Sequence, residues 1–469
     1  MSSTADDRRP SSVAVSDSVP TTIFAPALRV TTSGILLIVT LIAFEAIAVA
    51  AALPTAARAV HGLSSYGWAF TGFLVANVVG MVASGQICDA RGPRLPLIGG
   101  LVAFLGGLLT SGTAAQMWQL VLGRVVQGLG GGLLITAIYV VIGTRYPGEL
   151  SAKVFAAFAS AWVLPSLIGP LAAGTLAEHA SWRWVFLGLV PFVLVGAAAL
   201  VPALREIGPA AAVEGARLSA RRLVSAFATA LGVAALENAG QHRSIVAYVL
   251  GAAGLLAVIW GLRTLLPTGT IRVRPGVSAP VALRGLLAGA FFGVDALLPL
   301  TLTLQHDYSP TAAAVPLMVA GPAWAIGSWW QGRPRVAETG RRHVIRAGFL
   351  FVGLGAVLVA LAAQPDLPGG LAYLAWSVAG LGAGLAMSSV SVLLLDFTTP
   401  ADRGSDSAAL QIADVVSSAV TTGIGGVLIA AAASGLLGYT AAFTALDLTM
   451  AALAVIGAAL ASRARCATC

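Results

Sequence analysis

The stretch QMWQLVLGRVVQGLGGGLLITAIYVVIG, residues 116–143, decides the fold. Its one charged residue is Arg124, and it exceeds the roughly 20 apolar residues that cross a hydrocarbon core about 30 Å thick. A helix satisfies its own backbone hydrogen bonds in lipid, whereas a lone strand cannot. The strands of a membrane barrel would alternate apolar and polar residues, which this stretch does not. We therefore predict a transmembrane helix.

Similar apolar stretches recur along the chain. Hydrophobic residues make up 58% of the 469 positions and charged residues only 10%, against roughly 25% charged in soluble domains. An all-α polytopic membrane protein is therefore expected, with spans at residues 33–53, 67–87, 95–113, 116–143, 152–175, 184–204, 223–240, 244–264, 280–304, 311–330, 343–364, 368–395, 406–432 and 438–461. The span at 223–240 is the weakest of the fourteen, because it is short and carries Glu237 near its end.

The distribution of basic residues predicts the orientation. With the N-terminus inside, 23 of the 27 Lys and Arg residues fall on the inner side, among them Arg284, and three fall outside. This bias follows the positive-inside rule. We expect a multi-pass protein of the plasma membrane with both termini cytoplasmic. The net charge of +8 is then explained without a nucleic-acid partner.

An internal repeat divides the chain. Residues 128–133 (GLGGGL) match residues 380–385 (GLGAGL) at a shift of 252, although Ala/Gly-rich helices also match by coincidence. Two parallel repeats with a site between them are an architecture of alternating-access transporters. The predicted units are a disordered cytoplasmic tail, a six-helix bundle, a linker with two additional helices, a second six-helix bundle and a cytoplasmic tail, at residues 1–30, 31–205, 206–265, 266–463 and 464–469.

The segment GQICDARGPR, residues 85–94, follows the second span. It resembles the loop signature of the major facilitator superfamily, Gly-x-x-x-Asp-Arg-x-Gly-Arg-Arg/Lys, with Ala90 in place of an arginine. Small Gly85 is expected to let two helices approach closely. The resemblance implies a cytoplasmic latch between the two halves, and an ordinary tight turn is the alternative. The latch residues would be Gly85, Asp89, Arg91, Gly92 and Arg94.

Two further motifs support the resemblance. Arg124, Gln127 and Gly128 are similar to the family's Arg-x-x-x-Gly signature in span 4. An arginine inside a span costs about 2.5–3.5 kcal/mol on insertion scales, so it usually faces protein, although Arg124 could also snorkel to the outer interface. Span 5 looks like the antiporter motif Gly-Pro-x-x-Gly-Gly, and its residues are Pro165 in place of a preceding glycine, then Gly169, Pro170 and Gly174.

The segment Trp182-Arg183-Trp184-Val185-Phe186 opens the sixth span. It resembles the corresponding segment in the fourteen-span branch of the drug:proton antiporters. An aromatic belt at the membrane interface would also explain these residues. The resemblance implies the major facilitator fold, here two six-helix bundles plus two extra central helices.

Acidic residues within the spans are candidates for proton coupling. Glu45 lies in the first span and Asp295 in the ninth, 250 residues apart. Low dielectric favours the protonated form of a carboxyl group, so such residues are proton-relay candidates, with a structural ion pair as the alternative. Asp414 and then Asp447 are weaker candidates, and Glu237 is expected at the membrane interface. Arg124 could tune one of the acids.

The predicted function is proton-coupled efflux of small amphipathic compounds or drugs by a monomer. Its partners would be the lipid bilayer, the substrate and protons, with the proton gradient as energy source and no cofactor or metal. The chain has neither a Walker loop nor a cluster of histidines or nucleophile–base pairs, so we expect neither a primary pump nor an enzyme. A facilitator or proton symporter importing a metabolite is the alternative, followed by a non-transporting receptor or assembly factor.

Overall fold

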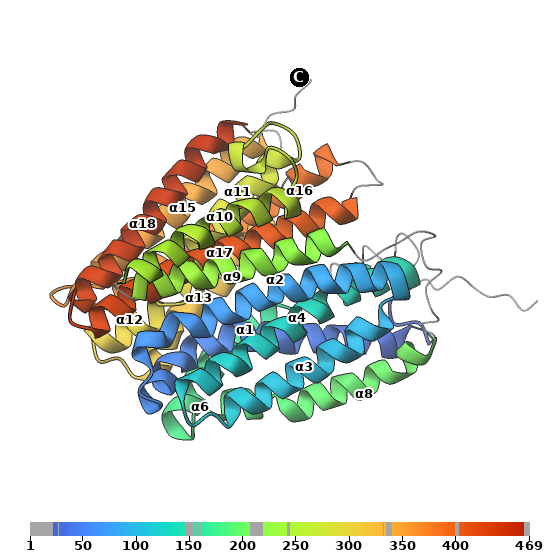
Figure 1. The fold of residues 1–469 in the computed structure, drawn as a ribbon, viewed down its shortest axis with the longest axis horizontal. Helices are drawn as coiled ribbons and strands as arrows, with labels where there is room; N and C mark the ends of the chain where they lie inside the picture. Colours follow the sequence, from blue (N-terminus) through green and yellow to red (C-terminus); the bar gives the residue numbers. More distant parts are fainter. Residues whose placement is uncertain are drawn as a thin grey trace, which may run out of the picture.

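The computed structural model describes residues 22–26, 28–146, 150, 153–154, 157–158, 161–206, 219–241, 244–331, 333, 340–398 and 403–463. All regular structure in these ranges is helical (Figure 1). The first half holds α1 (Arg29–Ala59), α2 (Tyr66–Arg91), α3 (Arg94–Gly112), α4 (Met117–Arg145), α6 (Val163–His179), α7 (Trp184–Leu187) and α8 (Val190–Glu206). A pair follows, α9 (Ala220–Gln241) and α10 (Ile245–Leu265). The second half holds α11 (Ser278–Asp295), α12 (Leu298–Gln305), α13 (Pro310–Gln331), α15 (Arg341–Ala362), α16 (Leu371–Phe397), α17 (Arg403–Ala433) and α18 (Tyr439–Leu460).

The predicted all-helical membrane fold is confirmed. Among the described residues, 12 helical stretches are long and apolar enough to cross a membrane. The short span expected at 223–240 is one of them, since α9 is apolar over Ala220–Gly240. Helices α6 and α8 lie where the fifth and sixth spans were predicted, and each has 17 residues. The count of fourteen spans therefore stays a prediction.

Two boundaries differ from the prediction for physical reasons. Helix α2 continues through Arg91, because no helix breaker precedes Gly92, whose φ of 80° ends the helix before Pro93. Most of the expected loop motif is therefore helical. The ninth span is broken into α11 and α12 at Ala296 and Leu297, next to Pro299.

Close glycine contacts repeat in the two halves. A Cβ at Gly132 of α4 would strike the backbone carbonyl of Asn77 on α2. A Cβ at Gly384 of α16 would strike the carbonyl of Trp324 on α13. Gly132 and Gly384 are 252 residues apart, as the sequence repeat requires. The α2–α4 and α13–α16 pairs are therefore equivalent, each held at backbone contact by the glycine run.

The two halves touch through α6 with α13 and α2 with α17. We name the ends of the bundle by one residue each: Arg58 lies in the last turn of α1, and Gly92 lies between α2 and α3. At the Arg58 end, Arg58 Nη2 donates to the Thr303 carbonyl at 3.0 Å and Tyr66 donates to the Ala296 carbonyl at 3.2 Å. Toward the Gly92 end, α18 and α8 diverge (Figure 1). The halves are thus closed against each other at the Arg58 end.

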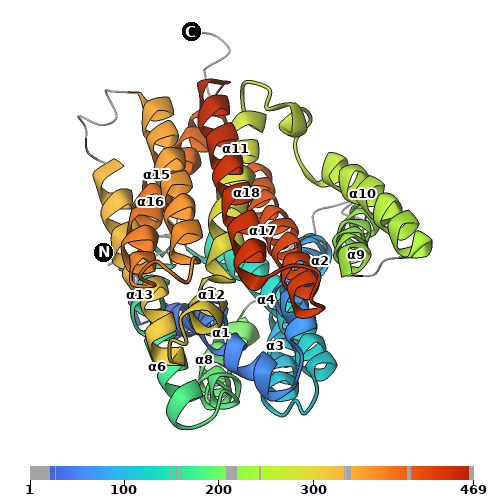
Figure 2. The same cartoon turned by 90° about the vertical axis from the view of Figure 1, so that its left-hand side faces the viewer.

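The α9–α10 pair packs beside both halves. Within it, Gly232 and Gly254 face each other, and a Cβ at Gly254 would lie 2.7 Å from the Gly232 carbonyl oxygen. Helix α9 contacts α2 of the first half and α17 of the second (Figure 2). The pair therefore spans the junction of the halves.

Candidate functional site

A buried charge cluster joins α1 to α4 in the first half. The Arg124 guanidinium forms an ion pair with the Glu45 carboxylate, and the side chains are 2% and 0% exposed. Gln127 Nε2 donates to the same Glu45 oxygen at 3.2 Å, and Ser111 holds the Gln127 amide oxygen at 3.1 Å. The Arg124 and Gln127 side chains share one face of α4, because the two residues are three positions apart.

Arg124 has further contacts that hold it inside the protein. Its Nε donates to the Ala69 carbonyl at 3.0 Å, and its guanidinium lies 4.2 Å from the centre of the Phe73 ring. Gly128 lets α2 approach closely, since a Cβ there would meet the Phe73 backbone. The alternative that Arg124 snorkels to the outer interface is wrong.

A corresponding pair joins α11 to α16 in the second half. Trp376 Nε1 donates to Asp295 Oδ1 at 2.8 Å. Trp376 stands 252 residues after Arg124, so a neutral indole takes the place of the guanidinium. Asp295 is the last residue of α11, at the break before α12. The two acids therefore occupy related places but have partners of different charge.

Aromatic rings surround the Asp295 pair. Phe291 stacks on Trp376 with ring centres 4.8 Å apart and meets the edge of Trp324 at 5.4 Å. Phe291 and Trp376 are buried, whereas Phe292 and Trp324 are partly exposed. Ring pairs in these geometries contribute about 0.5–1.5 kcal/mol each beyond burial. The cluster fixes Trp376 and presents aromatic surface beside a carboxyl group.

Asp414 belongs to a separate ion pair. Arg284 donates from Nε and Nη2 to Asp414 Oδ2 at 2.9 and 2.7 Å, and the side chains are 18% and 17% exposed. Arg284 also bonds Ser391 Oγ at 3.4 Å. Arg284, which was counted on the inner side in the positive-inside count, lies within α11, about two turns from its start; its side of the membrane stays a prediction. Inside the protein, Arg284 pairs with Asp414 of α17, which is 130 positions away in the sequence.

The residues of the predicted latch lie at the Gly92 end. Asp89 and Arg91 are exposed on the last turn of α2, and Arg94 is exposed at the start of α3. Gly85 is not the point of close approach, because a Cβ there would lie 3.9 Å from Thr136. The close contact with α4 is at Gly80 instead.

We predict that Asp89→Asn lowers transport while leaving insertion and abundance intact. Asp89 is exposed, and within the described residues its carboxylate takes part in no ion pair that would hold this conformation. We therefore expect its effect in another state of the cycle. Initial transport rates per copy in proteoliposomes test this. Rates equal to those of the wild type would mean that the segment is only a turn.

Helix α6, which carries the motif predicted in span 5, lies between α1 of the first half and α13 of the second. Pro165, Gly169 and Pro170 are buried. A Cβ at Gly169 would lie 3.7 Å from the Phe44 ring of α1, an ordinary contact. A Cβ at Gly174 would lie 2.7 Å from the Pro310 carbonyl oxygen on α13. Gly174 is therefore the member of the motif that the contact between halves requires.

Gly174→Ala is expected to impair transport strongly, because the added methyl group prevents α6 and α13 from closing at the Arg58 end. Gly169→Ala, in the same helix, serves as the matched control and is expected to stay within about twofold of wild type. Both are measured as transport rate per folded copy. Equal behaviour of the two variants would contradict the closure argument.

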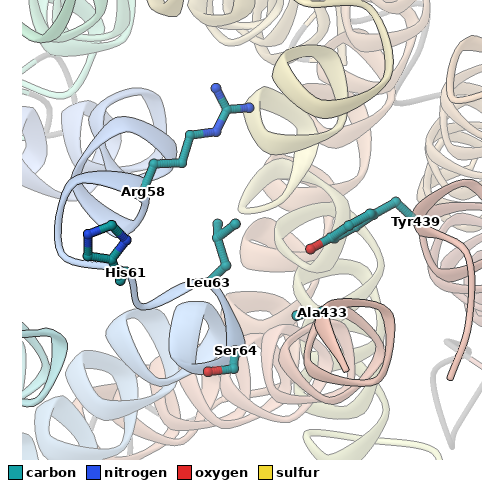
Figure 3. A pocket seen from close by; sticks show the side chains of 6 residues that line it. All are labelled: Arg58, His61, Leu63, Ser64, Ala433 and Tyr439. Carbon is teal, nitrogen blue, oxygen red and sulfur yellow. The ribbon is translucent and has the colours of Figure 1, made fainter. Parts of the chain in front are cut away.

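A hollow of about 400 Å³ lies at the Arg58 end (Figure 3). Residues of both halves line it: Arg58, His61, Leu63, Ser64, Ala433 and Tyr439. Arg58 is drawn toward α12 by its bond to Thr303. The hollow is separate from the two carboxyl clusters.

Sequence reasoning underrated three polar residues. Glu237 was expected at the membrane interface, but its side chain is 2% exposed and packed against α2 and α17. Asp447 is 3% exposed, and its Oδ2 has no hydrogen-bond partner in the described structure. The role of Trp376 could have been noticed, because it falls on Arg124 at the 252-residue shift.

Two similar helical halves that carry buried charges define a polytopic membrane transporter. Residues 35–420 match the model of the Major Facilitator Superfamily, so the chain belongs to that superfamily. It works in a lipid bilayer on a small-molecule substrate.

Relatives carry transporter names. A Mycobacterium tuberculosis protein named "Probable multidrug-efflux transporter" is 28% identical over 410 residues, covering 82% of this chain and 84% of its own. Multidrug resistance protein 3 of Bacillus subtilis is 31% identical over 158 residues, covering 34% of this chain and 31% of its own.

Solved structures share the fold. A D-xylose–proton symporter superposes with a TM-score of 0.65 at 15% identity, covering 92% of this chain and 97% of its own. The human organic anion transporter MFSD10 superposes with a TM-score of 0.60 at 14% identity, covering 93% and 100%.

Proposed function

We propose that this protein exports small amphipathic organic compounds in exchange for protons, by alternating access, as a monomeric member of the fourteen-span drug:proton antiporter branch. It would lie in the plasma membrane with both termini and the Gly92 end in the cytoplasm. The observation that carries the proposal is the pair of related acid sites, Glu45 with Arg124 and Asp295 with Trp376.

The different partners suggest different roles for the two acids. Glu45 faces a permanent cation, which favours its ionised form. Asp295 accepts a bond from a neutral indole in an aromatic setting, so its negative charge is less compensated. A buried carboxylate without a cation is costly, and taking up a proton removes that cost. Asp295 would therefore exchange the coupling proton, while Glu45 and Arg124 would form the fixed part of the site.

The same surroundings favour an aromatic, positively charged substrate. The partly exposed rings of Phe292 and Trp324 offer apolar contact, and rings attract cations at their faces. A cation and a proton would compete for the one negative charge of Asp295. Because only one of them can be bound at a time, this competition couples exit of the substrate cation to entry of the proton. Neutral amphipathic compounds could use the aromatic surface alone.

Efflux is favoured over import by the names of two relatives, one a "Probable multidrug-efflux transporter" and the other "Multidrug resistance protein 3". The alternative is a proton symporter or facilitator, since the fold is shared with a D-xylose–proton symporter. The contacts of this conformation are compatible with both efflux and import, because transport in either direction passes through a state that is closed at one end. The membrane potential can drive either an antiporter or a symporter, because moving one charge across it is worth about 2.3 kcal/mol per 100 mV.

The test is proton flux in proteoliposomes of known orientation. Ethidium and tetraphenylphosphonium serve as aromatic cations, and xylose as a neutral polar compound. An antiporter dissipates an imposed pH gradient when a cation is added on the opposite side. Movement of protons and compound in the same direction would establish the symporter. If no compound in a broad panel causes a proton flux, the proposal is wrong.

A further inference from the structure

Glu237 of α9 lies where three helices meet. Its Oε1 atom is 2.7 Å from the position that a Cβ would take at Gly67 of α2, and equally 2.7 Å from that at Gly426 of α17. The two glycine backbones touch, since a Cβ at Gly426 would lie 2.8 Å from the Gly67 Cα. The Thr71 hydroxyl lies beside the same carboxyl group. One side chain thus contacts both halves where they join.

The rest of α9 follows the same seam. Val233, together with Val258 of α10, packs on Ala419 of α17, and Leu74 and Val75 of α2 join this apolar cluster. One turn beyond Glu237, a Cβ at Gly240 would meet the Val427 side chain of α17. Figure 2 shows α9 beside α2 and α17. The helix is therefore packed as a third member of the junction rather than as a lipid-facing appendage.

The start of α2 offers a polar surface to a carboxyl oxygen at this point. Gly67 is the second residue of α2, where the backbone amides carry the positive end of the helix dipole. The Ser65 side chain does not cap this end. The Glu237 carboxyl oxygen therefore faces the α2 terminus while it also contacts α17. Separation of α2 from α17 would break this arrangement.

We propose that the α9–α10 pair is a working part of the outer gate, and that Glu237 is a positioning residue that favours the outer-closed state by holding α2 against α17. The proposal rests on the alternating-access function and on the orientation proposed above. It assigns a role in the cycle to helices outside the two repeated halves.

The experiment measures opening at the outer end without any substrate. Cys88, Cys466 and Cys469 are replaced, and Ala296→Cys serves as reporter. Ala296 is 5% exposed, and its carbonyl accepts the bond from Tyr66. A membrane-impermeant maleimide, added from outside, can react only when the halves separate. Labelling rates are compared in intact cells, with thermal melting as the measure of folding.

Glu237→Gln keeps the size of the side chain but replaces an acceptor oxygen by an NH2 group, and it is expected to raise the labelling rate about fivefold, with unchanged melting. Gly426→Ala, which pushes the backbones apart, is expected to raise it as well. Asp366→Asn removes an exposed acid between α15 and α16 at the same end and should change nothing. If Glu237→Gln does not fold, Glu237→Asp carries the same expectation, because its carboxyl is withdrawn from the glycines.

A wild-type labelling rate in Glu237→Gln, alongside faster labelling in Gly426→Ala, would overturn the proposal, since the glycine contact alone would then close the gate. The same labelling rate in both variants and the parent would also overturn it. Loss of transport with every compound in the parent protein would refute the proposed function and leave this labelling result standing. The two failures are therefore distinguishable.

Discussion

Arg124→Met is expected to remove most of the folded protein from the membrane. The change leaves the Glu45 carboxylate fully buried without the cation that pairs with it. Breaking one side of a buried ion pair costs about 3–5 kcal/mol, a large part of a total stability of about 5–15 kcal/mol. The measurement is membrane abundance and the monodisperse fraction after detergent extraction.

The matched control removes both charges. Glu45→Gln combined with Arg124→Met leaves no unpaired charge, so abundance should recover, whereas transport should not. The single variant Arg124→Met at wild-type abundance would contradict the argument. It would mean that Glu45 takes up a proton readily inside the fold, and the coupling role would then move to Glu45.

Asp295→Asn is expected to abolish accumulation of substrate against its gradient while exchange at equal concentrations continues. The asparagine oxygen can still accept the hydrogen bond from Trp376, so the aromatic cluster keeps its geometry. Only the exchangeable charge is lost. Uptake of a labelled cation into inverted vesicles, with and without a pH gradient, separates the two activities.

Trp376→Phe provides the control for Asp295. It keeps a ring against Phe291 and removes the indole donor, so gradient-driven transport should persist at a reduced rate. Full accumulation by Asp295→Asn, with the wild-type pH dependence, would place the coupling residue elsewhere. Asp414 would then be tested next, although its bond to Arg284 already neutralises it.

The fold could be predicted from the sequence because its signals are local. Runs of apolar residues mark the helices, and Gly92-Pro93 marks the turn after α2. Helix ends were less certain where polar residues continue a helix without a breaker, as in α2. The break between α11 and α12 was also not predicted, since Ala296 and Leu297 are ordinary helix residues and Pro299 is its only local signal.

The site was predictable only in part, because partners come from distant segments. The acids Glu45 and Asp295 were identified by their place in apolar runs, and the repeat related them to each other. Nothing local in the sequence pairs Arg284 with Asp414, or brings Glu237 to Gly67 and Gly426. Close approach was assigned to Gly85 rather than Gly80, since spacing alone does not tell which glycine faces a backbone.

The glycine contacts repeated between the halves bear on the origin of the protein. A gene duplication would have copied the packing of α2 on α4 into that of α13 on α16. The two copies could then diverge nearly everywhere, except where any side chain would collide with the backbone of the neighbouring helix, as at Gly132 and Gly384. At those two positions the same backbone contact would remain although most of the surrounding sequence differs. The α9–α10 hairpin lies between the two copies in the chain, at a point where an insertion would interrupt neither of them.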